Sequence, residues 1–374
     1  LLSGIIPARP TTTNANRYVA VKVIPEEDYE ETGESMYHPR LKGTHYEMGL
    51  HYGALLHSKG VSFEDFIQLD DKQIEFGKQS LAILKKFCPE IVDELFGMAE
   101  GQKLLPERFA YNLLTAGVFE KDIGCSCACF RHGDDLIFAR NHDMFAYLKK
   151  TTESALYRPD GKYIFLGQSD AIVGKEDGVN EKGLAVGINF VAPKTIKPGI
   201  NFLFIVRHML ENFTLVAECV DWLQEVPLSS TQNFIMVDKT GDMKVVEACA
   251  EKQVVRNPES QYIISTNHFV TPEMQPYDNA PMKNWYQSET RYTTLETALS
   301  NENDEQESIQ FGKDLLSGKY GFVCNYDRKI KFDTLWSFIV RINDLQIHRA
   351  EGNPMKAKYE EDKRLAWGIS KDRK

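Results

Sequence analysis

Residues 124–143 read Gly124-Cys125-Ser126-Cys127-Ala128-Cys129-Phe130-Arg131-His132-Gly133-Asp134-Asp135-Leu136-Ile137-Phe138-Ala139-Arg140-Asn141-His142-Asp143. Two apolar runs flank the turn-forming residues 132–135, a composition typical of a β-hairpin. If Gly133-Asp134 is the two-residue turn, Cys125 lies opposite His142. Arg140 is then the diagonal neighbour of Cys125 on the same face, roughly 7–8 Å away. Asn141 and Asp143 point to the other face unless the strand ends or bulges there.

The cysteines at 125, 127 and 129 alternate and therefore share one face of the predicted strand. Free cysteine behaves as a small buried hydrophobe, so three core residues are one interpretation. A metal site is a second, although such sites more often use Cys-x-x-Cys pairs or spaced histidines. A catalytic thiol is the third, because a thiol beside a guanidinium can lose its proton near neutral pH. These residues alone leave all three open.

The chain has 374 residues, a formal net charge of −10 and a sequence pI near 5.5. Nucleic acid and anionic membranes select basic surfaces, so we expect neither as a partner. No run approaches the roughly 18 consecutive apolar residues of a membrane-spanning helix. The seven scattered cysteines favour reduced thiols and a cytoplasmic location over a disulfide framework. A signal peptide removed before Leu1 is equally compatible with this sequence.

The order of predicted elements favours layered α+β packing, with helices on the outer faces of sheets. Thr44 and Glu47 predict a capping box for a helix over 41–57, and Gly49 and Gly53 form a narrow stripe for close packing. Residues 62–119 are expected to form a helical block that begins near Ser62. We expect further helices at 202–225, 283–299 and 305–317, and strands at 18–23, 163–166, 171–173, 184–188, 233–238, 244–248, 262–264 and 332–350.

Four segments occur in order: Gly124-Cys125-Ser126 with Arg140-Asn141-x-Asp143, the run Asp177–Phe190, Ser265-Thr266-Asn267-His268-Phe269, and Ser288-x-x-Arg291. Together they resemble the linear amide C–N hydrolases, which are N-terminal-nucleophile hydrolases related to the choloylglycine hydrolases. The long segment before Cys125 is similar to the acyl-CoA:6-aminopenicillanic-acid (isopenicillin-N) acyltransferase-like branch. The resemblance implies a four-layer αββα sandwich with an N-terminal helical segment.

The resemblance also implies that the chain cleaves itself between Gly124 and Cys125. This would give an N-terminal pro-segment or α-subunit, 1–124, and a catalytic β-subunit, 125–374. The freed α-amino group of Cys125, with a reference pKa of about 7.7–8.0, would act as base for its own thiol. By position in the motifs, Asp143 would hold that amino group, Arg140 would set the local charge, Asn189 and Asn267 would stabilise the oxyanion and hold the amino terminus, and Arg291 would be a second cation.

The implied activity is hydrolysis or transfer of the acyl group of an N-acylated amine or amino acid, through an S-acyl-Cys125 intermediate. We expect a small-molecule substrate, no cofactor and no bound metal, and the sequence leaves a homo-oligomer open. Cys125-Ser126-Cys127 stands where the family often has Cys-Thr-Ser, so Cys127 is a rival nucleophile. The alternatives are an acyl-CoA-dependent N-acyltransferase, a non-catalytic binding module, and a thiol metal or redox protein with the same fold.

Overall fold

The computed structural model describes residues 36–64, 67–119, 124–279, 286–302, 305–326 and 331–372. The strand expected at 18–23 lies outside them. The helices are α1 His45–Ser58, α2 Asp71–Phe87, α3 Pro89–Gly101, α4 Pro106–Thr115, α5 Phe202–Asn212, α6 Val216–Glu225, α7 Ser288–Ser300, α8 Ser308–Leu316 and α9 Arg364–Asp372. The strands are β1 Arg40–Gly43, β2 Gly124–His132, β3 Asp135–Phe145, β4 Glu153–Pro159, β5 Phe165–Ser169, β6 Asp177–Asn180, β7 Ala185–Phe190, β8 Gln232–Val237, β9 Met243–Ala248, β10 Gln253–Arg256, β11 Tyr262–Ser265, β12 Phe332–Arg341, β13 Gln346–Ala350 and β14 Glu360–Glu361.

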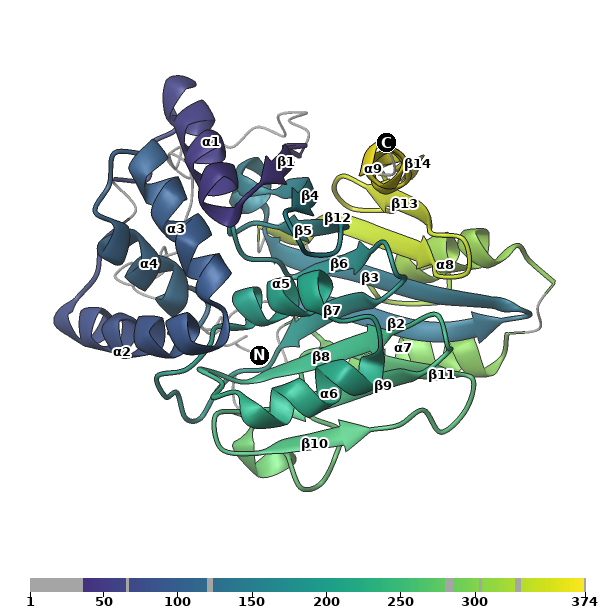
Figure 1. The fold of residues 1–374 in the computed structure, drawn as a ribbon. Helices are drawn as coiled ribbons and strands as arrows, with labels where there is room; N and C mark the ends of the chain where they lie inside the picture. Colours follow the sequence, from purple (N-terminus) through teal and green to yellow (C-terminus); the bar gives the residue numbers. More distant parts are fainter. Residues whose placement is uncertain are drawn as a thin grey trace, which may run out of the picture.

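Within the described residues the strands form two sheets (Figure 1). The larger has the order β1-β4-β5-β6-β7-β8-β9-β10, and the smaller has the order β11-β2-β3-β12-β13-β14. Strands β1 and β4 run parallel, and the other neighbouring strands run antiparallel. Strand β2 of the smaller sheet contacts β7 and β8 of the larger, so the two sheets face each other.

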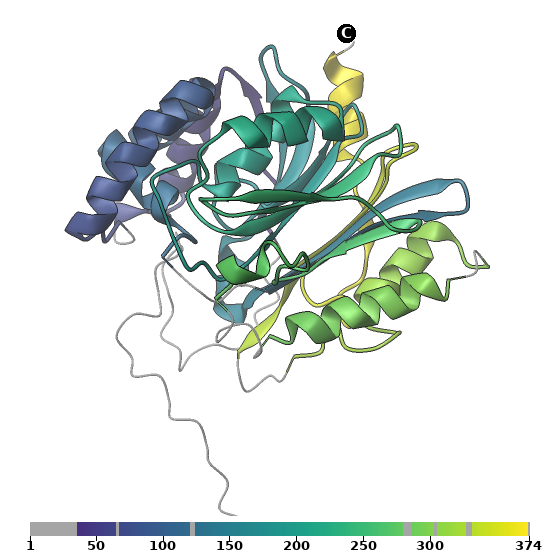
Figure 2. The same ribbon diagram turned by 90° about the horizontal axis from the view of Figure 1, so that it is seen from below.

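Helices cover the outer face of each sheet (Figure 2). Helices α5 and α6 contact strands of the larger sheet, whereas α7 and α8 contact β2, β3, β11 and β12 of the smaller. Apolar side chains of both sheets fill the space between them, among them Phe138, Leu166, Ile235 and Phe338. The four layers confirm the predicted αββα sandwich.

The hairpin of β2 and β3 has the predicted register. Gly133 has φ +57, which suits a two-residue turn, and Cys125 pairs with His142 across the ladder. The three alternating cysteines belong to the core between the sheets. Ala128 and Phe130 point to the opposite face, where they pack against the α7 and α8 side of the sheet.

The N-terminal helices form a separate block beside the sandwich (Figure 1). Thr44 and Glu47 make the predicted capping box of α1. A Cβ atom on Gly49 would lie 2.1 Å from the carbonyl oxygen of Glu94, so α1 and α3 are packed backbone to backbone at the predicted stripe. The predicted helix start near Ser62 is wrong. Helix α2 begins at Asp71, because Asp70 supplies its N-terminal cap.

Buried polar contacts join this block to the sandwich. Arg207 of α5 donates to both carboxylate oxygens of Glu94 of α3, at 3.2 and 2.6 Å. Glu211, one turn further along α5, lies 3.0 Å from His45 Nε2 of α1. Tyr52 of α1 also donates to a buried carboxylate of the larger sheet. The block is therefore fastened to the core by charged groups that water does not reach.

The predicted strand at 171–173 is wrong. Residues 170–176 form the loop between β5 and β6, and Ile172 there has φ +57, which a strand cannot accommodate. The apolar run is buried as predicted. The ammonium group of the buried Lys175 fixes the loop by donating to the carbonyl oxygens of Ile172 and Gly174.

Among the described residues, no helix combines the length and the apolar character that a membrane crossing needs.

Candidate active site

Cys125 is contacted at its nitrogen, oxygen and sulfur by side chains from three places in the fold: the segment after β11, helix α7 and the neighbouring strand β3. Its N–H donates to Asn267 Oδ1 at 2.7 Å. Its carbonyl oxygen accepts a hydrogen bond from Arg291 Nη1. Its sulfur accepts from Arg140 Nη2 at 3.1 Å. The structure thus brings together four of the predicted site residues, all fully buried.

Asn267 and Arg291 support each other. Asn267 lies two residues after the end of β11, and its backbone N–H donates to Ser288 Oγ at the start of α7, at 2.8 Å. Arg291, in the first turn of α7, donates to Asn267 Oδ1 at 2.8 Å and to Ser126 Oγ at 2.8 Å. Asn267 Nδ2 donates in turn to the Phe190 carbonyl at 2.8 Å. The amide oxygen therefore faces Cys125 in a fixed orientation.

Arg140 is held from three sides. It forms an ion pair with Asp177 at the start of β6, and its Nε and Nη2 donate to the Ile188 carbonyl at 3.2 and 3.1 Å. Asp177 also accepts from Trp336 Nε1 at 2.9 Å. A Cβ on Gly187 would lie 3.0 Å from Arg140 Cδ, so a side chain at that position of β7 would crowd the guanidinium.

The pKa of the Cys125 thiol is higher than its contact with Arg140 alone would predict. Burial raises its pKa to about 12, although the Arg140 guanidinium acts in the opposite direction. The predicted contact between thiol and guanidinium is present, but desolvation outweighs it in the continuous chain. The thiol is consequently protonated at neutral pH, and a base has to remove its proton before it can attack.

Asp143 lies on the opposite face of β3 from the thiol. Its carboxylate accepts from Thr334 Oγ1 at 2.6 Å and from Tyr326 OH at 2.8 Å. It lies 3.8 Å from Arg291 Nη1 and pairs with Gly124 across the ladder. In the continuous chain the acceptor of the Cys125 N–H is therefore Asn267, and Asp143 lies next to the bond that precedes Cys125.

Asn189 is fully buried near the end of β7, and neither polar atom of its side chain has a hydrogen-bond partner among the described residues. Its cross-strand neighbour is Asn233 of β8, whose Nδ2 donates to the carbonyl oxygens of Thr266 and His268 on either side of Asn267. Asn189 is thus an unused donor, whereas Asn233 shapes the backbone around Asn267.

Gly124 is required by packing. A Cβ atom there would lie 2.8 Å from the ring of Phe332 and 3.1 Å from Asp143 Cβ. Its φ is not in the left-handed region, so the backbone freedom of glycine is not what the site uses.

The sequence analysis did not assign a role to a second group of buried side chains beside the thiol. His142 Nδ1 lies 3.6 Å from Cys125 Sγ and 3.0 Å from Glu176 Oε2. His142 Nε2 lies 3.6 Å from Asp170 Oδ2, and the ring stacks on Trp336 with centroids 3.9 Å apart. The predicted pairing of His142 with Cys125 was a signal for the histidine. The two acids lie at the ends of the loop 170–176, on either side of the segment 171–173 that was predicted as a strand.

These three groups, His142, Asp170 and Glu176, offer ligand atoms within 4.8 Å of one another. However, Arg140 Nη2 lies 3.3 Å from His142 Nδ1 and places a fixed positive charge against that nitrogen. The arrangement therefore suits proton transfer better than the binding of a cation.

Cys127, the rival nucleophile, is also fully buried, and burial raises the pKa of its thiol well above the usual value.

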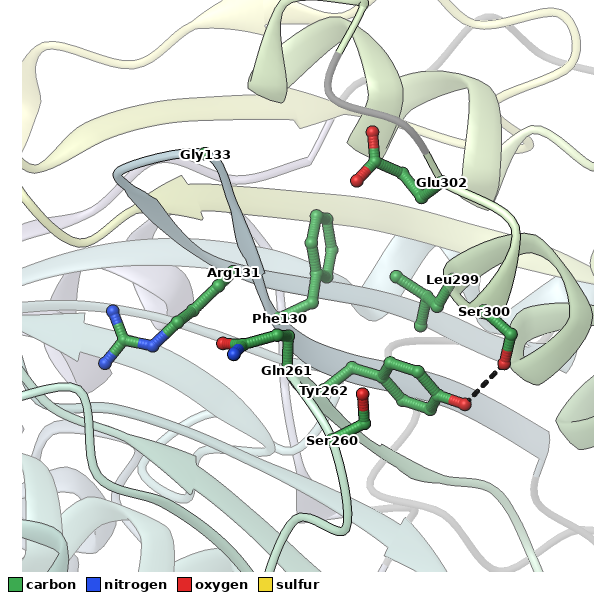
Figure 3. A pocket seen from close by; sticks show the side chains of 9 residues that line it. All are labelled: Phe130, Arg131, Gly133, Ser260, Gln261, Tyr262, Leu299, Ser300 and Glu302. Atoms are coloured by element: carbon green, nitrogen blue, oxygen red, sulfur yellow. Dashed lines mark hydrogen bonds between the residues drawn. The ribbon is translucent and has the colours of Figure 1, made fainter.

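The described residues also line a cavity of about 550 Å³ at the other end of β2 (Figure 3). Phe130, Arg131 and Tyr262 line it, and the Tyr262 hydroxyl pairs with Ser300 Oγ at 2.6 Å. Phe130 is five residues from Cys125, or about 17 Å along an extended strand, and its side chain is on the opposite face. This cavity is therefore separate from the thiol.

A four-layer sandwich that carries a cysteine at the start of a central strand is the architecture expected of an N-terminal-nucleophile hydrolase. Residues 130–356, more than half of the chain, match the family acyl-coenzyme A:6-aminopenicillanic acid acyl-transferase. The chain belongs to this family. The match begins at residue 130 and does not include Cys125, so the assignment of Cys125 as the nucleophile depends on its contacts with Asn267, Arg291 and Arg140.

Individual proteins are similar to this chain only over part of its length or at low sequence identity. Penicillin V acylase from Pectobacterium atrosepticum is 32% identical over 111 residues, which cover 24% of this chain and 29% of that protein. The chain thus aligns with less than a third of that relative's length. Penicillin V acylase from Agrobacterium tumefaciens has a TM-score of 0.43 and 17% identity, covering 61% of this chain and 82% of the other. A variant of the conjugated bile acid hydrolase from Clostridium perfringens has a TM-score of 0.46 and 15% identity, covering 64% and 93%.

Proposed function

We propose that this chain is a self-processing cysteine amidohydrolase that cleaves a linear amide C–N bond through an S-acyl-Cys125 intermediate. The observation that carries the proposal is the contact of Cys125 at three atoms by Asn267, Arg291 and Arg140. A core cysteine needs no such contacts, whereas a nucleophile has to be oriented.

In the processed enzyme the α-amino group of Cys125 would take the thiol proton. Asn267 Oδ1 already accepts from this nitrogen at 2.7 Å, so it would keep the amine beside its own thiol. Arg140, 3.1 Å from the sulfur, would stabilise the thiolate. The thiolate then attacks the amide carbon of the substrate, and the amine product leaves with the proton. Water finally releases the acyl group from the sulfur.

The two asparagines would divide the remaining work. Asn267 uses both ends of its amide to orient Cys125. Asn189 Nδ2 has no partner among the described residues, so it is free to donate to the oxyanion of the tetrahedral intermediate. One such donor typically contributes about 10²–10³-fold in rate.

Processing between Gly124 and Cys125 would leave 1–124 and 125–374 bound to each other. The contacts of Glu94 and His45 with α5 cross between the two fragments and are fully buried. The N-terminal block would therefore remain as a subunit of the working enzyme.

Acyl transfer is a second candidate, because the family to which the chain belongs is named for acyl-coenzyme A-dependent transfer. The same S-acyl-Cys125 intermediate serves both reactions. They differ in whether water or an amine takes the acyl group.

The test is to incubate the purified protein with N-acyl substrates that carry fatty, phenylacetyl, bile-acid or aminoacyl groups, and to quench with acid. Peptide mass spectrometry should find the acyl mass on Cys125. Cys125→Ala should lose both adduct and turnover. Cys127→Ala, on the same strand face two residues on, should keep both. Turnover that survives Cys125→Ala contradicts the proposal, and added amines that capture the acyl group distinguish transfer from hydrolysis.

A further inference from the structure

The bond before Cys125 has to break before any α-amino group exists, so the thiol needs a different base for that first reaction. Its pKa is raised to about 12 by burial, so the uncatalysed thiolate fraction at neutral pH is small. Among the described residues, the imidazole of His142 is a basic group in contact with the sulfur, at 3.6 Å.

We propose that His142, positioned by Glu176 and Asp170, accepts the thiol proton of Cys125 during self-cleavage. This inference assumes the proposed processing at Gly124–Cys125. It assigns to the unprocessed chain a Cys125–His142 pair that becomes dispensable once the α-amino group has formed.

The ring can accept the thiol proton in one of its two tautomers. Arg140 Nη2, which can only donate, lies 3.3 Å from His142 Nδ1. The tautomer that can accept carries its hydrogen on Nε2 and keeps the Nδ1 lone pair; Glu176 Oε2 also lies 3.0 Å from Nδ1. Asp170 Oδ2, 3.6 Å from Nε2, lies on that side of the ring. Burial lowers the pKa of His142, which keeps the ring neutral and able to accept at neutral pH.

The ring cannot turn away easily. It stacks on Trp336 with an interplanar angle of 10°. Glu176 is anchored through its own backbone, because its N–H donates to the Gln168 carbonyl and its carbonyl accepts from Ile188 N–H, both at 3.0 Å. The Ile188 carbonyl binds Arg140, so the groups on both sides of Nδ1 are fixed to the same strand.

The acids also suit the charge that the reaction creates. A carboxyl group lies on each side of the ring, and an ionised carboxylate beside an imidazolium stabilises a charge that burial would otherwise disfavour. The groups that face His142 are Cys125 from β2, Arg140 from β3, Asp170 and Glu176 from the β5–β6 loop, and Asp177 from β6. Burial and the neighbouring Asp170 raise the pKa of Glu176.

The step balances as a proton relay. The thiol proton moves to His142 Nδ1, and the sulfur bonds to the Gly124 carbonyl carbon. The bond from that carbon to Cys125 N then breaks, and the imidazolium returns its proton to the leaving nitrogen. The products are a Gly124 thioester and the free α-amino group. Water hydrolyses the thioester to the Gly124 carboxylate and restores the thiol.

The experiment follows self-cleavage of freshly refolded full-length chain by intact mass, from pH 4 to pH 9. His142→Phe keeps a flat ring on Trp336 but removes the base. His208→Phe is the matched control, because His208 is half-buried and also stacks on a tryptophan, Trp222, at 4.3 Å. We expect His142→Phe to slow cleavage at pH 7 by about 100-fold or more, the usual contribution of a general base. The control should cleave at the wild-type rate.

The pH profile separates this role from a structural one. The wild-type rate should fall at acid pH as His142 becomes protonated, below the usual histidine pKa because burial lowers it. The residual rate of His142→Phe should instead rise with pH, because it depends on spontaneous ionisation of the thiol.

Glu176→Gln provides a second test should His142→Phe fail to fold, with Glu247→Gln as its control. Glu247 is a fully buried acid that pairs with Arg256 away from Cys125. Cleavage of Glu176→Gln should be about tenfold or more slower than that of Glu247→Gln. Equal rates within either pair, or stoichiometric metal that is lost in Glu176→Gln, would overturn the inference. A wild-type chain that never cleaves would instead refute the proposed function.

Discussion

Replacing Gly97 by alanine should push apart the two helices at the centre of the N-terminal block. A Cβ on Gly97 of α3 would lie 2.2 Å from the Tyr46 carbonyl oxygen and 2.9 Å from the Leu50 nitrogen of α1. Carbon–oxygen contacts are normally about 3.3 Å or longer, so the helices would have to separate by roughly 1 Å. Both neighbours are backbone atoms, and neither can rotate out of the way.

The magnitude follows from two opposing effects. Overpacking of this kind costs about 1–3 kcal/mol, and sometimes more. Alanine regains about 1 kcal/mol of helix propensity over glycine. Because both close contacts are with backbone atoms, the cost should lie near the upper end of that range, and the net expectation for Gly97→Ala is a loss of about 2 kcal/mol in the free energy of unfolding. At roughly 2–4 °C per kcal/mol for a large domain, the melting temperature should fall by about 4–8 °C.

Gly312→Ala is the matched control. Gly312 lies in α8, where a Cβ would meet Ile339 at 3.4 Å, an ordinary contact. This variant should keep the propensity gain of up to about 1 kcal/mol and melt at a slightly higher temperature. Thermal unfolding followed by circular dichroism, with both changes made in a Cys125→Ala background to keep the chain continuous, measures the difference. If Gly97→Ala melts as high as its parent, the backbone-to-backbone packing of α1 and α3 is wrong.

Three further results are expected. Asn267→Ala removes the acceptor of the Cys125 N–H and should reduce kcat/KM about 100-fold or more in steady-state assays, with near-normal KM. Glu94→Gln breaks a buried pair with Arg207 and should cost about 3–5 kcal/mol, read as a lower urea midpoint; an unchanged midpoint would mean that the pair does not hold the block. Burial acts to raise the pKa of Glu211, but the Arg207 guanidinium holds this pKa at about 2. The stability that Glu211 supplies is therefore complete above its unfolded pKa of about 4.3 and is lost as the pH falls toward 2. Melting temperatures of wild type and Glu211→Gln should therefore converge over that pH range.

The hairpin shows what a local pattern can predict. The glycine turn fixes the register between β2 and β3, and the register alone places Arg140 and His142 beside Cys125. The capping box of α1 is similarly local, since Thr44 and Glu47 are three residues apart. Such features depend on neighbours in sequence and need no knowledge of the tertiary fold.

The reactivity of the thiol could not be predicted in the same way. Proximity to Arg140 suggested an acidic thiol, but the closing of two sheets over Cys125 raises its pKa. Burial is a property of the whole sandwich and has no signature within residues 124–143.

The loop at 170–176 marks a second limit. Its buried apolar residues gave a strand pattern, whereas the ion pair of Lys175 with Glu153 and the contacts of Lys175 with loop carbonyls hold it as a loop. Only the folded loop brings Asp170 and Glu176 to His142. Sequence spacing separates these acids from the histidine by about thirty residues, and nothing in their local pattern links them.

Amino-terminal sequencing of the purified protein, paired with its intact mass, tests the central claim most directly. We predict two associated fragments, one of which begins Cys-Ser-Cys-Ala, and a single uncut chain for Cys125→Ala. A wild-type protein that turns over N-acyl substrates while its Gly124–Cys125 bond remains intact would contradict the account.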